Sequence, residues 1–70
     1  MNIHYIKSLI VEKSDSAKGS EVEGTVSEII EDLKKRICED ENVSSLDDLD
    51  DSKEINPQLN EFVKALEYAI

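Results

Sequence analysis

The stretch Ile3-His4-Tyr5-Ile6-Lys7-Ser8-Leu9-Ile10-Val11-Glu12 decides the fold, because two incompatible structures fit it. Its β-branched and aromatic residues favour a strand with one face made of Ile3, Tyr5, Leu9 and Val11. The alternative is a helix that uses Ile3, Ile6 and Ile10 at helical spacing, and periodicity alone does not separate the two in so short a run. The residue types favour the extended form, so the sequence predicts a strand over residues 3–12.

The next residues offer this strand a partner. Ser14 to Gly19 is rich in turn-forming types, and Glu21 to Val26 alternates so that Val22 and Val26 would share one side. A β-hairpin is therefore expected at the N-terminal end of the chain. If residues 20–26 are helical instead, the first strand must pair with another copy of itself or with a sheet edge of a partner.

A long amphipathic helix is predicted next. Its apolar stripe at helical spacing is Val26, Ile29, Ile30, Leu33 and Ile37. Two capping boxes compete for its start, Ser20 with Glu23 and Thr25 with Glu28, and Gly24 favours the later one. The pairs Glu31–Lys35 and Asp32–Arg36 have the favourable i,i+4 order, and the acidic residues 39–41 oppose the helix dipole, so the helix should end near them.

A second amphipathic helix is predicted to run to the C-terminus. Asn56 is a good N-cap residue, and Pro57 suits the first helical position. The apolar stripe comprises Leu59, Phe62, Val63, Leu66 and Ile70. Its spacing matches that of the first helix, so the two seams can pack together. Residues 1–70 are thus expected to form one small α+β domain, with a strand or hairpin followed by two helices.

An acidic segment joins the two predicted helices. Residues 39–54 contain eight acidic residues and only Lys53, so they carry −7 of the net charge of −9. Ser45 can cap a short helix in which Leu46 and Leu49 face inward. We predict that this segment and one exposed aromatic residue form the binding site for a partner. The candidate residues are Glu39, Asp40, Glu41, Asp47, Asp48, Asp50, Asp51 and Tyr68.

The density of these carboxylates points to a basic partner. On a helix, four aspartates in the five residues 47–51 would place one charge per ~1.9 Å of axis, against one per ~1.7 Å in duplex DNA. This favours a non-enzymatic protein that binds a basic surface, such as that of a nucleic-acid-binding protein, as a stoichiometric inhibitor or neutraliser. Inhibitors from mobile elements and antitoxins are of this type. The alternative is a homodimeric or accessory assembly subunit whose acidity serves only solubility.

Charge and length exclude several other classes. A net charge of −9 and an isoelectric point near 4.4 disfavour direct binding to nucleic acid or to an anionic membrane surface. No run approaches the ~20 apolar residues of a membrane span, and we expect a cytoplasmic protein. The calcium-loop pattern fails, because Ser45 replaces its glycine and Asp51 its final glutamate.

Few residues offer catalytic chemistry. His4 is the only imidazole and Cys38 the only thiol, so no internal disulfide forms, and we expect neither enzymatic activity nor a metal or other cofactor. The tripeptide Ser45-Leu46-Asp47 resembles the serine motif of acyl carrier proteins, a family that is small, acidic and all-helical. That resemblance covers three residues, with Ser44 where the family has aspartate, and would make Ser45 the attachment site of a prosthetic group.

Overall fold

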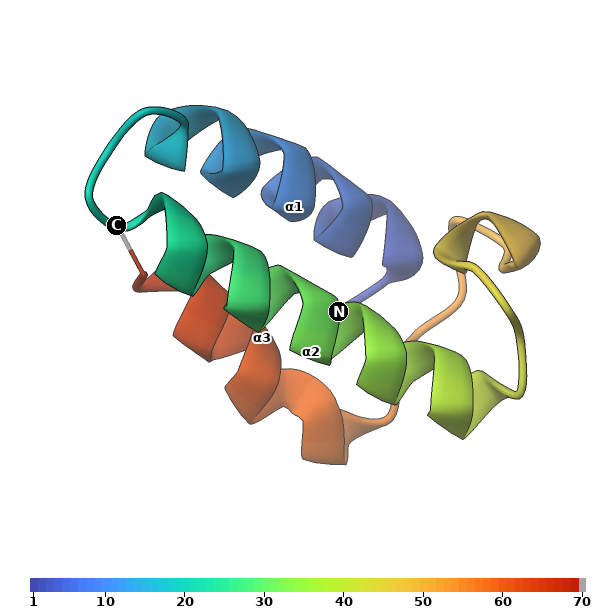
Figure 1. Ribbon diagram of the computed structural model, residues 1–70. Helices are drawn as coiled ribbons and strands as arrows, with labels where there is room; N and C mark the ends of the chain where they lie inside the picture. Colours follow the sequence, from blue (N-terminus) through green and yellow to red (C-terminus); the bar gives the residue numbers. More distant parts are fainter. Residues whose placement is uncertain (70) are drawn as a thin grey trace.

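Three helices make up most of the chain. The computed structural model describes residues 1–69. Its helices are α1 at Ile3–Ala17, α2 at Glu23–Glu41 and α3 at Asn60–Glu67, with 3₁₀ turns η1 at Leu46–Asp48 and η2 at Pro57–Leu59 between the last two. In Figure 1, α1 and α2 lie side by side and antiparallel, and α3 packs against both. The fold is an up-down-up bundle.

The predicted strand over residues 3–12 is wrong, and the α+β class is wrong with it. This stretch forms most of α1, where Ile3 and Ile6 are fully buried and Leu9 is 6% exposed. Tyr5 and Val11 lie on the outer surface, with 40% and 60% of their area exposed. Burial of one helical stripe outweighs the strand preference of single residues, which is small and depends on context.

The predicted hairpin is also wrong. α1 continues to Ala17, and the chain turns at Gly19, whose positive φ of 78° suits glycine. Val22 precedes α2 and is 37% exposed, whereas Val26 is buried, so the two do not share a strand face. Within residues 1–69 the only β pairing is an isolated antiparallel bridge between Asn2 and Glu54.

α2 confirms the first predicted helix but begins earlier than expected. It starts at Glu23, so Gly24 lies within its first turn, and no side chain caps it. Neither predicted capping box forms as proposed: Glu23 Oε2 instead accepts from the Gly19 N–H at 3.2 Å. The i,i+4 pair Asp32–Arg36 forms at 3.1 Å.

α3 confirms the second predicted helix at its start but not at its end. The Asn56 side chain accepts from the Gln58 N–H at 3.0 Å, and Pro57 follows it, but this first turn is 3₁₀ before α3 proper. The α-helix ends at Glu67 rather than at the C-terminus. Ile70, the last residue of the predicted stripe, lies outside the described residues.

The core lies between the three helices and extends under the loop from α2 to α3. Its buried side chains are Ile3, Ile6, Leu9, Ala17, Val26, Ile30, Leu33, Ile37, Leu46, Ile55, Val63 and Leu66. The accessible surface is 4560 Å², close to the ~4,400 Å² expected of a folded monomer of this mass. The chain therefore buries a normal share of its surface without a second subunit.

Candidate acidic interface

The acidic end of the bundle is the part that follows α2, residues 39–54. It begins in the last turn of α2, which contains Glu39 to Glu41. Asn42 then takes the left-handed conformation at φ 56°, and the Val43 N–H donates to the Cys38 carbonyl at 3.0 Å. This is a Schellman stop, which satisfies the last helical carbonyls. The predicted end of the helix near these acidic residues is confirmed.

The middle of the acidic end is a single 3₁₀ turn held on the core. The Ser45 hydroxyl accepts from the Asp47 N–H at 3.2 Å and caps η1, as the sequence predicted. Leu46 is buried and Leu49 is half-buried, whereas Asp47 and Asp48 face solvent. The expected inward leucines and outward aspartates are confirmed.

Backbone hydrogen bonds fasten this segment to the start of α1. The Ile3 N–H donates to the Lys53 carbonyl and the His4 N–H to the Asp51 carbonyl, both at 2.9 Å. The Tyr5 N–H donates to the Asn2 side chain, also at 2.9 Å. The first helical N–H groups need partners from outside the helix, and the acidic end supplies two of them. It is thus held in place by α1.

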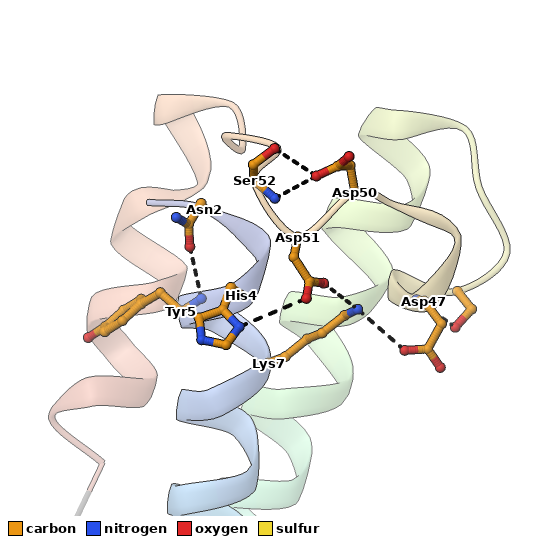
Figure 2. Close-up of polar contacts among 9 residues, drawn as sticks. Asn2, His4, Tyr5, Lys7, Asp47, Asp50, Asp51 and Ser52 are labelled. Carbon is orange, nitrogen blue, oxygen red and sulfur yellow. Dashed lines mark hydrogen bonds and ion pairs between the residues drawn. The ribbon is translucent and has the colours of Figure 1, made fainter.

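Lys7 neutralises part of the cluster. Its ammonium lies 3.0 Å from Asp51 Oδ1 and 3.5 Å from Asp47 Oδ1, and Figure 2 shows it between the two carboxylates. The hydrogen bond to Asp51 is the main reason why the pKa of Lys7 lies above its usual value. On the other side of Asp51, His4 Nδ1 lies 3.9 Å from Oδ2. Sequence reasoning did not identify Lys7 or His4 as part of this surface.

The remaining carboxylates differ in how far they are engaged. Lys53 pairs with Glu41 at 3.3 Å, and Asn56 donates weakly to Asp40 at 3.4 Å. Asp50 accepts from both the hydroxyl and the N–H of Ser52, and these bonds lower the pKa of Asp50.

Two carboxylates at the acidic end contact no donor or cation of the described chain. Within the described chain, the side-chain carboxylates of Glu39 and Asp48 are in no hydrogen-bonded or ion-paired contact. Asp40 and Asp50 accept hydrogen bonds but meet no cation there. These four carboxylates are the ones that remain available to a basic partner.

The structure brings together seven of the eight candidate residues and separates the eighth. Glu39 to Glu41 and the four aspartates lie at the end of the bundle where α1 begins and α2 ends. Tyr68 directly follows α3 and is 84% exposed, and Figure 1 shows that α3 runs away from the end where α1 begins and α2 ends. Tyr68 therefore does not belong to the same surface.

The aspartates do not form the regular array that the DNA comparison assumed. η1 ends at Asp48, and Leu49 is extended with ψ 147°. Asp47 and Asp51 also share one cation. The spacing of ~1.9 Å per charge requires a continuous helix, so the acidic end has high charge density without the helical spacing.

Other chemistry finds little support at this end. Between residues 1 and 69 no group of three or more His, Cys, Asp or Glu side chains is arranged to hold a metal ion. Ser45 serves as the cap of η1, and Cys38 is half-buried on α2.

Between residues 1 and 69 no helix combines the length and apolar character that crossing a membrane requires. No protein-family model, curated protein or solved structure matches the chain.

Proposed function

We propose that this protein binds a basic surface of another protein through its acidic end, as a stoichiometric, non-enzymatic inhibitor or neutraliser. The observation that carries the proposal is the concentration of −7 of the total −9 charge in residues 39–54, on a segment fastened to the start of α1. A charged surface that is already ordered loses less conformational entropy on binding than a flexible tail does.

The partner is defined by its chemistry. Carboxylates in solvent attract a basic groove or patch over about a Debye length and raise the association rate. A nucleic-acid-binding protein has such a surface. Binding there would exclude the nucleic acid by competition for the same basic residues, even though the aspartates do not reproduce the phosphate spacing.

The test uses two variants of equal net charge. Asp40→Asn/Asp48→Asn removes two available carboxylates from the acidic end, and Glu12→Gln/Glu21→Gln removes two exposed carboxylates elsewhere on the surface. The immobilised wild-type protein captures proteins from a lysate of its host, and a captured basic protein is purified for affinity measurements with all three forms. We expect roughly three- to tenfold weaker binding for the first variant, with little change for the second.

Salt and competition complete the test. Wild-type affinity should fall between about 0.05 and 0.2 M salt, and duplex DNA should compete if the captured protein binds nucleic acid. Equal affinity for wild type and Asp40→Asn/Asp48→Asn would refute the proposal, as would an equal loss in the control variant.

A further inference from the structure

A groove between α1 and α2 forms a second surface, which reaches the acidic end at Glu39 and Asp47. It has a volume of about 660 Å³, and no α3 residue lines it. Apolar atoms of Ile10, Val11 and Cys38 line it, and Val11 is 60% exposed. Charged residues of α2 line the same groove, so its chemistry is apolar with a charged border.

The charges on this border are self-complementary. Ser27, Glu31, Lys34 and Cys38 follow one another at spacings of four, three and four residues, which places them on one stripe of α2. No ion pair forms on Glu31 or Lys34 within the described part of the chain, and the predicted Glu31–Lys35 pair does not form. These charges are therefore free to meet another molecule.

This pattern fits two copies of the chain that are related by a two-fold axis crossing α2 between Asp32 and Leu33. It would place Glu31 of one copy opposite Lys34 of the partner subunit, and the reverse. Ser27 would likewise lie opposite Cys38 of the partner subunit. Such an interface is isologous, since the same patch serves both copies.

The same axis keeps the acidic ends apart. α2 has 19 residues, which span about 28 Å at ~1.5 Å per residue. An antiparallel pairing puts the two acidic ends at opposite ends of the dimer, well beyond the Debye length of about 8 Å at physiological salt. A parallel pairing would bring two segments of charge −7 together, so the charge distribution selects the antiparallel form.

We propose that the α1–α2 groove binds a second copy of this chain, with the two α2 helices antiparallel and the groove residue Val11 covered in each copy. Because the monomer already buries a normal share of its surface, the dimer forms reversibly and depends on concentration. The test of the basic partner stays separate from this proposal, because Asp40 and Asp48, the two acidic residues changed in that test, do not line the groove.

The first experiment fixes the geometry by cross-linking. With an added oxidant, such as oxidised glutathione, to accept the two electrons, Ser27→Cys should form a disulfide between Cys38 and the introduced thiol of the other copy, identified by peptide mass mapping. The same two positions within one chain are 11 residues apart, about 16 Å along the helix, and cannot be joined. Ser27→Cys/Cys38→Ser should lose this link, and Lys64→Cys on α3 should not form an equivalent one.

The second experiment tests the charges. By light scattering and sedimentation, wild type should approach twice the chain mass of 7.9 kDa as concentration rises. Glu31→Lys and Lys34→Glu should each weaken dimerisation roughly tenfold, and the double swap should restore it. A protein that stays monomeric into the millimolar range overturns the proposal. So does a dimer that ignores both single swaps, or one that links Cys38 mainly to Cys38.

Discussion

Lys7 is the basic residue on which the acidic end depends most, since it meets both Asp47 and Asp51. Tyr5, two positions earlier, donates from its hydroxyl to Glu67 at 2.5 Å, and this bond raises the pKa of Tyr5. Opposite sides of one turn of α1 thus contact the acidic end and α3. The Asp50 carboxylate accepts hydrogen bonds from Ser52 and does not contact Lys7.

Protonation of the Asp50 carboxylate should weaken its hydrogen bonds with Ser52, and the pKa of Asp50 sets the pH at which this happens. Ser52 lowers the pKa of Asp50 below the ordinary 3.8, so the stabilisation is present above pH 3.8 and is lost as the pH falls through the lower folded-state pKa. Ser52→Ala removes the hydroxyl donor, and an NMR titration should place the pKa of Asp50 closer to 3.8 than in wild type. Ser44→Ala is the control, and a wild-type pKa at or above 3.8 would contradict the assignment.

At the scale of elements, the two glycines play opposite parts. Gly19 has a φ of 78° in the turn after α1, and Gly24 lies inside the first turn of α2 with open space around it. A side chain at position 19 requires a strained backbone, whereas one at position 24 does not.

Two alanine substitutions should therefore change stability in opposite directions. Gly24→Ala should raise the free energy of unfolding by about 0.5–1 kcal/mol, because alanine favours the helix. Gly19→Ala should lower it by about 1 kcal/mol, because alanine disfavours a positive φ. Urea denaturation of both variants beside wild type checks this, and an equal effect of the two changes would contradict the assigned backbone conformations.

The elements that the sequence predicted well carry strong periodicity and local caps. Asn56 with Pro57, and the stripe from Val26 to Ile37, specify their helices without help from the rest of the chain. The stretch after Asn2 does not, because its cap includes carbonyls of Asp51 and Lys53 from nearly fifty residues away. Local composition favoured a strand there, and contacts distant in sequence decided against it. The same long-range packing brings Lys7 next to Asp47 and Asp51, which local sequence patterns do not reveal.

At the scale of the whole molecule, the charge is divided unevenly along the bundle. The acidic end carries −7, and the other residues together carry only −2. Repulsion within one end opposes folding, and salt screens it more effectively than it screens close ion pairs.

Stability should accordingly rise with salt. Between about 0.01 and 0.15 M salt the Debye length falls from about 30 to 8 Å, and the melting temperature should increase by several degrees, on the order of 1 kcal/mol. Asp40→Asn/Asp48→Asn should show a smaller rise than Glu12→Gln/Glu21→Gln at the same net charge. Calorimetry at a concentration where the protein is monomeric measures this, and equal rises in the two variants would show that the acidic end is not the source.

The hydrogen bonds from Ile3 and His4 to the carbonyls of Lys53 and Asp51 have a further consequence. The loop cannot detach without releasing the first turn of α1, so the two segments should open as one unit and exchange their amide protons together. A ligand that binds the loop and holds it in place would slow hydrogen exchange at the Ile3 and His4 amides. Exchange at the start of α1 would therefore report binding at the acidic end.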